Sequence, residues 1–310
     1  MIAASAVSPL ASGDPTADRR HGWARDLAET GRPGEAAELM EQALELVPEW
    51  AAGWFALATF REAAGDATAV AAYVHALALD PTDRCGAALR LARLGAAGGP
   101  VDGSAHVRAL FDDYAPRFEA ALTGALDYRG PQLLAAAIER VAPGRRFAMG
   151  LDLGCGTGLM ARAIRDRVDR LAGVDLSPEM VARAHRTGLY DALAVGELVT
   201  DLAGRAAGSC DLITAADVFC YLGDLRPAFA AVARIATPGA LFAFSVERAE
   251  AVGVDDRVML GDGLRFAHPE SHLDAAAAAT GFGARTIEIA PLRLDRGAAV
   301  IGSIITFTKS

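Results

Sequence analysis

The spacing of hydrophobic and polar positions changes near residue 100. Between His21 and Gly98, apolar residues recur at helical spacing and are interrupted by glycine and proline. Beyond this region, short apolar runs of strand length alternate with helical segments. The pattern predicts an α-helical domain at 21–98, a linker at 99–105 and an α/β domain at 106–310. Residues 1–20 have no apolar period, so we predict a disordered lead there.

The helical segment repeats itself when it is shifted by 33 residues. The overlaid pairs are Leu27 with Phe60, Ala36 with Ala69, Met40 with Tyr73, Ala43 with Ala76, and Pro48 with Pro81. Small and large apolar residues at these positions fit two antiparallel helices closed by a proline. The segment resembles two tetratricopeptide repeats and a partial third helix. So short a solenoid either docks on the chain or a sister subunit, or offers a concave surface to a protein partner.

The second segment predicts a mostly parallel sheet of seven strands. Two helices come first, at 107–126 and 132–141, and helix and strand then alternate, which implies right-handed crossovers. The expected strands are 147–153, 171–175, 192–198, 211–215, 240–247, 285–294 and 298–308. Only three residues join the last two strands, which forces an antiparallel hairpin.

Composition narrows the classes of partner. The 310 residues include 39 Asp and Glu against 30 Lys and Arg, a formal charge of −9, which disfavours nucleic acid as a partner. No apolar run has the length of a membrane span, and the first twenty residues lack the pattern of a signal peptide. The four scattered cysteines favour a reducing, cytoplasmic compartment and form no metal-binding motif.

The run LDLGCGTG at 151–158 is the most informative motif. An apolar strand ends there in glycine at alternate positions, and a helix follows directly. Glycine leaves room for a ligand to approach the backbone. Dinucleotides and adenosyl compounds both use such turns, but a dinucleotide loop needs a small residue where this chain has Leu159. Alternate glycines instead favour a loop around the methionine part of S-adenosyl-L-methionine.

Further motifs extend this interpretation. Asp175 follows Gly158 by 17 residues at the end of the next strand, where a carboxylate can accept both ribose hydroxyls. With GVDLSPEMVARA, AADVF and ATPGALFAFSVE, the segment 105–310 resembles a class I S-adenosylmethionine-dependent methyltransferase. FDDYAPRFE, LDYRGP and LRFAH are similar to bacterial predicted methyltransferases with N-terminal tetratricopeptide repeats. The resemblance implies a Rossmann-like methyltransferase fold and S-adenosyl-L-methionine as the cofactor.

The resemblance also implies a set of cofactor contacts. An acidic residue at Asp152 faces the cofactor's amino group, unless it bonds the loop backbone. The Glu197 region meets adenine, with Asp201 as the competing acid. Tyr114 and Arg129 meet the methionine carboxylate, although core packing alone would explain the aromatic spacing. The candidate cofactor-binding residues are Asp152, Gly154, Cys155, Gly156, Gly158, Asp175, Leu176, Glu197, Leu198, Asp217, Tyr114 and Arg129.

Three residues are candidates for catalysis. Asp217 closes the fourth strand, where it either binds the acceptor or caps the turn. Tyr221 follows one turn later and serves either the acceptor or the core. His268, with Arg265, is a candidate contact for an acidic acceptor. Pro269 is expected to start a helix and turn His268 outward as a cap, which disfavours a metal site.

The predicted activity is SN2 methyl transfer to an unidentified acceptor, with a small molecule favoured over a protein. A carboxylate or phenolate needs only positioning, whereas an alcohol, amine or carbon acceptor needs a general base. Asp217, Glu247, Tyr221 and His268 are the available bases. One alternative is a scaffold whose repeats bind a partner beside a weakly active or inactive methyltransferase domain. A nicotinamide oxidoreductase is disfavoured by Leu159 and by the terminal hairpin.

Overall fold

The computed structural model describes residues 11–99, 101–118, 127–248, 257–261, 263–295 and 297–310. The chain divides into two compact units, residues 1–106 and 107–310. A search of the described helices for a stretch long and apolar enough to cross a membrane finds none.

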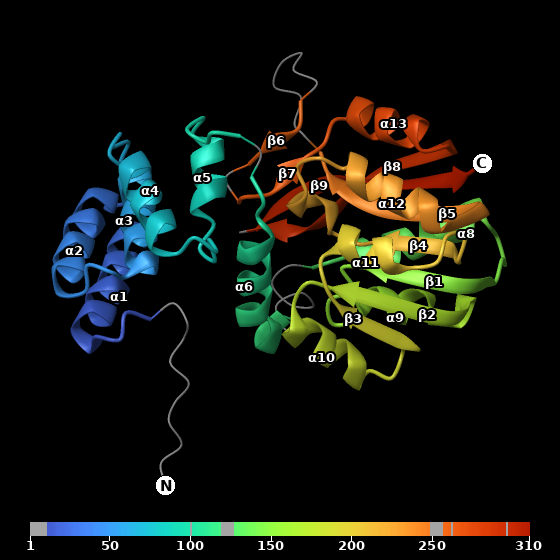
Figure 1. Ribbon diagram of the computed structural model, residues 1–310, viewed down its shortest axis with the longest axis horizontal. Helices are drawn as coiled ribbons and strands as arrows, with labels where there is room; N and C mark the ends of the chain where they lie inside the picture. Colours follow the sequence, from blue (N-terminus) through green and yellow to red (C-terminus); the bar gives the residue numbers. More distant parts are fainter. Residues whose placement is uncertain (1–10, 100, 119–126, 249–256, 262, 296) are drawn as a thin grey trace, which may run out of the picture. The chain divides into compact units, whose positions relative to one another are not determined.

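The first unit consists of helices connected by short turns (Figure 1). They are α1 (Pro15–Glu29), α2 (Pro33–Leu46), α3 (Ala51–Ala63), α4 (Ala69–Leu79) and α5 (Ala87–Arg93). Consecutive helices pack against each other through small and aromatic side chains, and Met40 and Tyr73 are fully buried at equivalent places in α2 and α4. Pro48 and Pro81 each lie two residues beyond the end of those helices. Burial thus follows the 33-residue shift, while the tetratricopeptide assignment stays a prediction.

The prediction of a disordered lead at 1–20 is wrong for its last part. Helix α1 begins at Pro15, and the Asp14 side chain accepts hydrogen bonds from the Thr16 and Ala17 amides at 2.7 and 2.9 Å. An aspartate cap before a proline at the first helical position starts a helix even where no apolar period is visible. Residues 1–10 lie outside the described residues.

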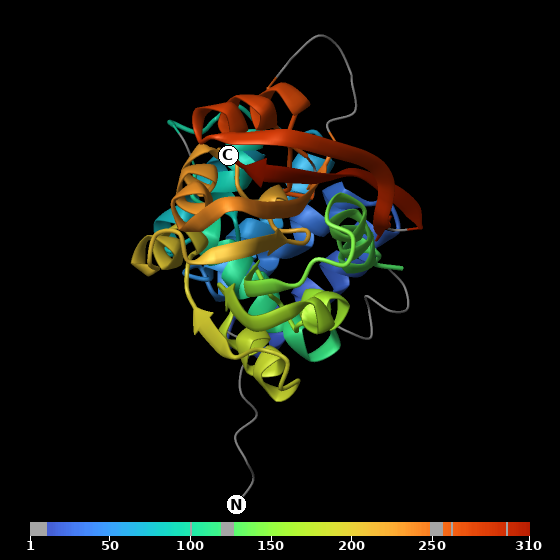
Figure 2. The same cartoon turned by 90° about the vertical axis from the view of Figure 1, so that its right-hand side faces the viewer.

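The second unit contains a nine-stranded sheet whose first five strands are parallel. The strands are β1 (Phe147–Leu153), β2 (Val168–Asp175), β3 (Ala192–Val195), β4 (Cys210–Ala215), β5 (Ala236–Glu247), β6 (Met259–Leu260), β7 (Phe266–Ala267), β8 (Phe282–Asp295) and β9 (Ala298–Lys309). The order β3-β2-β1-β4-β5 continues through β9, which is antiparallel to both β5 and β8. Figure 2 shows the red hairpin at one edge and β3 at the other. The predicted parallel sheet and terminal hairpin are confirmed.

Three details differ from the sequence-based expectation. The strands β6 and β7 have two residues each, too few to produce a hydrophobic period, so no pattern predicted them. The predicted strand 192–198 ends at Val195, because Leu198 begins a helix capped by Glu197. The first predicted helix is α6 (Ser104–Tyr114) followed by the short 3₁₀ helix η1 (Ala115–Arg117), and residues 119–126 lie outside the described residues.

Helices cover both faces of the sheet. On one face, α8 (Gly130–Val141) and α9 (Leu159–Ile164) bury Leu134, Ile138 and Met160. On the other, α11 (Leu198–Gly204), α12 (Arg226–Ile235) and α13 (Glu270–Ala279) pack around a cluster of phenylalanines that includes Phe229 and Phe242. Two more helices, α10 (Pro178–Arg186) and η3 (Phe219–Tyr221), follow β2 and β4. This two-faced core fixes the carboxyl ends of the parallel strands as the edge for a ligand.

Candidate functional site

The loop after β1 contains the three alternate glycines in left-handed conformation. Their φ values are 61°, 52° and 94° at Gly154, Gly156 and Gly158, and Gly158 is the N-cap of α9. A Cβ on Gly154 would lie 2.4 Å from Val218, so this glycine lets the loop pack against the segment after β4. A Cβ on Gly156 would meet only Phe118, at 3.9 Å. The middle glycine therefore faces the open side of the loop.

Asp175, at the end of β2, is held beneath this loop. Its carboxylate accepts hydrogen bonds from the Gly156 amide at 2.8 Å and from the Ser177 amide at 2.9 Å. Each oxygen keeps a further lone pair for a ligand hydroxyl. Burial raises the pKa of Asp175, opposed by these amide hydrogen bonds. Nearby in the loop, the Thr157 hydroxyl is buried and has no hydrogen-bond partner among the described residues. The Asp175 carboxylate and the Thr157 hydroxyl thus both have hydrogen-bonding capacity left for a bound polar molecule.

Asp152 is fully buried one residue before the end of β1. Thr214, opposite it on β4, donates to one carboxylate oxygen at 2.9 Å, and Tyr190 donates to the other at 2.6 Å. Gly173, opposite it on β2, makes room for the Tyr190 ring, since a Cβ there would lie 2.9 Å from that ring. Burial raises the pKa of Asp152 to about 7, because the two hydroxyl donors only partly offset desolvation.

Sequence reasoning missed the two hydroxyl partners of Asp152. The loop backbone, which was the alternative partner, is not among its hydrogen-bond donors. Gly173 was the available signal, because a glycine inside an apolar strand marks a close approach by another group.

Helix α6 and η1 lie over the glycine loop. Ser177 donates a 2.5 Å hydrogen bond to Asp112 of α6. The Phe111 ring packs edge-on against Tyr221 at 5.4 Å between centroids, and Tyr114 packs against Phe118 at 5.6 Å. Of these aromatic rings, Phe118 is the one beside the glycine loop, 3.9 Å from a Cβ on Gly156.

Arg129 and Glu197 are placed differently from their predicted roles. The Arg129 side chain is exposed and makes no hydrogen bond or ion pair with described residues; its amide donates to the Leu292 carbonyl at 2.9 Å. Glu197 caps α11, accepting from the amides of Val199 and Thr200 at 2.9 and 2.7 Å. Asp201 instead pairs with Arg205. The Glu197 carboxylate therefore has a structural role, and a contact between this region and adenine stays a prediction.

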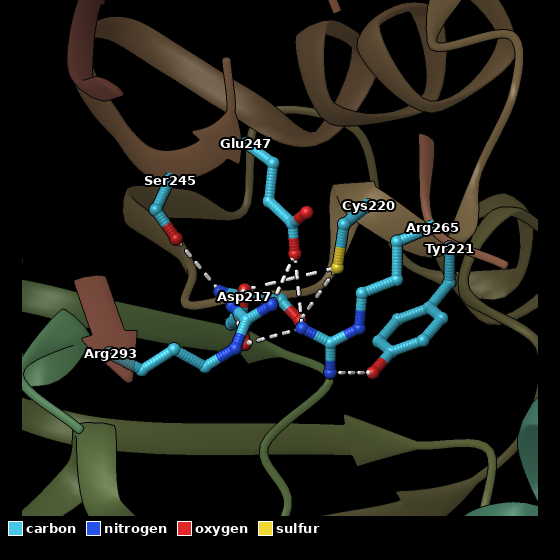
Figure 3. Close-up of polar contacts among 7 residues, drawn as sticks. All are labelled: Asp217, Cys220, Tyr221, Ser245, Glu247, Arg265 and Arg293. Carbon is cyan, nitrogen blue, oxygen red and sulfur yellow. Dashed lines mark hydrogen bonds and ion pairs between the residues drawn. The ribbon is translucent and has the colours of Figure 1, made fainter. Parts of the chain in front are cut away.

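A buried cluster of charges occupies the carboxyl ends of β4 and β5 (Figure 3). Arg293, from the terminal hairpin, donates to both oxygens of Asp217 at 2.9 and 3.0 Å and also bonds Glu247. Arg265 donates to Glu247 at 3.0 Å and to the Tyr221 hydroxyl at 2.6 Å. Within the described part of the chain, the guanidinium groups of Arg265 and Arg293 pair with the carboxylates of Asp217 and Glu247.

Asp217 is tied into this cluster by its backbone as well. Its φ of 59° is uncommon for a residue with a Cβ, and its amide donates to the Ser245 hydroxyl at 2.8 Å. Burial raises the pKa of Asp217, and the nearby Arg265 guanidinium opposes that shift. The candidate residues Asp217 and Tyr221 both contact Arg265 in this cluster, and sequence reasoning missed Arg293, which is distant in sequence.

Asp217, Cys220 and Glu247 bring one possible metal-ligand atom each within 4.8 Å of one another. Both carboxylates already accept hydrogen bonds from guanidinium groups, and burial raises the pKa of the Cys220 thiol. A cation would have to displace two arginines and ionise that thiol. We assign no metal to this cluster.

The expectation that His268 turns outward is wrong. Its side chain is 3% exposed, and Nε2 lies 2.8 Å from the Leu222 carbonyl, to which it donates. Its amide donates to the Glu247 backbone carbonyl at 3.3 Å. The helix start at Pro269 does not set the direction of this side chain, because the imidazole is held inward by its hydrogen bond to the Leu222 carbonyl. His268 thus holds the η3 turn in place instead of facing an acceptor.

His268 predicts a dependence of stability on pH. Burial lowers its pKa to about 4, well below the 6.5 of an exposed histidine. Between these values the unfolded chain binds a proton that the folded chain does not, so stability rises with pH there. This residue raises the free energy of unfolding by about 1 kcal/mol per pH unit in that range. We expect His268→Gln to flatten the pH dependence of urea unfolding between these values, and an unchanged slope would contradict the assignment.

Comparison with known proteins agrees with this geometry. Residues 151–244 match the family model for a methyltransferase domain. The ubiquinone biosynthesis O-methyltransferase of Hahella chejuensis is 35% identical over 34% of this chain and 45% of its own length. The malonyl-[acyl-carrier protein] O-methyltransferase of Enterobacter lignolyticus is 30% identical over 49% and 57%. The chain spans about half the length of these curated relatives.

Solved structures show the same fold. The 1,6-didemethyltoxoflavin-N1-methyltransferase of Burkholderia thailandensis, bound to its namesake compound and S-adenosylhomocysteine, has a TM-score of 0.51 at 18% identity. It covers 68% of this chain and 92% of its own. The cyclase SpnF has a TM-score of 0.55 at 17% identity, covering 69% and 99%. The second unit therefore has the Rossmann-like methyltransferase fold.

Proposed function

We propose that this chain is an S-adenosylmethionine-dependent methyltransferase. The observation that carries the proposal is the alternate-glycine loop with Asp175 fixed beneath it, inside the segment that matches a methyltransferase domain. The cofactor supplies a methyl group on a positively charged sulfur. Asp175 would hold the ribose hydroxyls, Asp152 the amino group, and the aromatic cover of α6 would keep water away.

We further propose that the acceptor atom is the oxygen of an acid that ionises unaided, such as a carboxylic acid or an acidic phenol, on a small molecule. Each candidate base is already engaged. Both oxygens of Asp217 accept from Arg293, and Glu247 accepts from both arginines. Tyr221 accepts from Arg265 and burial raises its pKa, while His268 is bonded to the Leu222 carbonyl. An acceptor that arrives as an anion needs only positioning. Two relatives named as O-methyltransferases support an oxygen acceptor.

The direct test uses purified protein and S-adenosylmethionine with a labelled methyl group. Candidate carboxylic acids, phenols, alcohols and amines are offered in parallel, and labelled product is separated by chromatography. We expect label on acids and acidic phenols, with a rate that follows the ionised fraction of the acceptor. Transfer to amines or unactivated alcohols at comparable rates would contradict the acceptor class while leaving methyl transfer itself intact.

Asp152 predicts that cofactor binding releases a proton. Its pKa of about 7 means that the carboxyl is partly protonated at neutral pH, and the cationic amino group of the cofactor favours the ionised form. S-adenosylhomocysteine affinity should therefore rise with pH below about 7, by up to about tenfold per unit. Calorimetry in buffers of different ionisation enthalpy measures the released proton directly. Asp152→Asn should abolish the release, and an equal release in this variant would contradict the role.

A scaffold that binds the cofactor without transferring its methyl group is the second candidate. The observation in its favour is the likeness to the cyclase SpnF, since one fold can host unrelated chemistry. Binding of S-adenosylhomocysteine without label transfer to any host small molecule or protein would favour it. Label on a host polypeptide would instead favour the helical repeats as a platform for a protein substrate.

A further inference from the structure

An arginine-rich groove lies on the second unit, and neither Asp152 nor the residues of the charge cluster line it. Its volume is about 600 Å³, within the range of small-molecule sites. Three arginines line it: Arg162 from α9, and Arg183 and Arg186 from the last turn of α10. Thr187 completes the polar part, and no described acidic residue lines the groove.

The α10 arginines lack the partners that neighbouring arginines have. Elsewhere in this unit, arginines commonly pair with acids across elements, as in Arg140 with Glu288 and Arg146 with Asp169. Within the described part of the chain, Arg183 and Arg186 form no ion pair, and the buried Nε of Arg183 has no hydrogen-bond partner. An unsatisfied buried donor costs free energy unless a ligand meets it. The helix dipole favours a positive charge near a helix C-terminus, which explains Arg183 and Arg186 individually. It does not explain why they converge with Arg162 from α9.

The chemistry of the lining identifies the ligand class. Guanidinium groups bind carboxylates and phosphates through paired hydrogen bonds, and three of them around one groove favour a group that can carry two negative charges, such as phosphate. The Thr187 hydroxyl already donates to the Ala184 carbonyl at 2.6 Å, so recognition rests on the arginines. Ala115, Pro116 and Leu189 add an apolar wall. We propose that this groove binds the phosphate group of a small phosphate ester whose organic part packs on that wall.

The groove also touches both sides of the proposed cofactor site. Ala115 and Pro116 belong to η1, which directly follows the covering helix α6. Thr187 would lie 3.6 Å from a Cβ on Gly158, the third glycine of the loop. A ligand in the groove therefore contacts the base of the cover and the back of the loop. This coupling rests on the proposed function: we expect the ligand and S-adenosylhomocysteine to change each other's affinity by the same factor.

The first experiment is independent of the cofactor. Pyrophosphate, inorganic phosphate, glycerol 3-phosphate and citrate are titrated into the protein by calorimetry, without S-adenosylhomocysteine. We expect saturable binding of glycerol 3-phosphate, weakened at least about tenfold in Arg183→Gln/Arg186→Gln. Arg170→Gln, at an exposed position on β2, serves as the matched control and should bind normally. Circular dichroism melting shows that each variant is folded.

Each outcome decides the proposal. Tighter binding of inorganic phosphate or pyrophosphate than of the ester would overturn the ester while retaining a phosphate site. Equal binding of citrate would overturn phosphate recognition, and binding unaffected by the double substitution would place the ligand elsewhere. A second titration adds S-adenosylhomocysteine. Phosphate binding in a protein that fails to bind S-adenosylhomocysteine would uphold the groove and contradict the proposed cofactor.

Discussion

Replacing Asp175 with alanine is expected to weaken S-adenosylhomocysteine binding by about 3 kcal/mol, or roughly 100-fold. The carboxylate would accept two ribose hydroxyls, and each hydrogen bond to a charged acceptor contributes more than a neutral one. The same substitution frees the amides of Gly156 and Ser177, which now donate to Asp175. Calorimetry measures the affinity, and thermal melting measures the fold.

Two further variants separate ribose recognition from loop support. Asp175→Asn keeps one carbonyl oxygen for the Gly156 amide but removes the charge, so we expect an intermediate loss of affinity. Asp169→Ala removes an exposed carboxylate from the same strand, where it pairs with Arg146, and should bind normally. Wild-type affinity in a folded Asp175→Asn or Asp175→Ala protein would sink the ribose assignment.

Replacing Arg293 with methionine is expected to destabilise the protein by about 3–5 kcal/mol. The side chain is 7% exposed and is the partner of both Asp217 and Glu247. Its loss removes the guanidinium that bonds both oxygens of Asp217 and one partner of Glu247, and removing one partner of a largely buried ion pair costs far more than the pair contributes. Urea unfolding at neutral pH measures the change.

The matched control is Arg140→Met, which breaks an exposed ion pair to Glu288 on the same strand, β8. We expect at most about 1 kcal/mol for that change. Adding Asp217→Asn to the Arg293 variant removes one of the abandoned charges and should recover part of the loss. If Arg293→Met were no more destabilising than Arg140→Met, Arg293 would not be the buried partner on which Asp217 and Glu247 depend.

The sequence was sufficient for features encoded by local patterns. The parallel sheet and its carboxyl edge are predicted by three local patterns: the glycine run, the carboxylate of Asp175 and the alternation of helix and strand. The terminal hairpin followed from the three residues between its strands. Such features depend on residues close in sequence, so period and spacing report them.

The partners of the predicted residues were not visible in the same way. Tyr190 reaches Asp152 because Gly173 leaves space, and Arg293 reaches Asp217 from 76 residues away. His268 was predicted to face outward because the helix start at Pro269 is visible in the sequence, whereas the contact of the imidazole with the Leu222 carbonyl is not. In each case the tertiary structure brings together groups whose separation in sequence carries no period.

The position of Arg293 on β8 has a consequence for local motion. Among the described strands this one pairs only with β9, yet the Arg293 guanidinium bonds Asp217 and Glu247 at the ends of β4 and β5. Detachment of β8 would take the Arg293 guanidinium away from Asp217 and Glu247. The amides of β8 and those around Asp217 should therefore exchange with deuterium as a single cooperative unit.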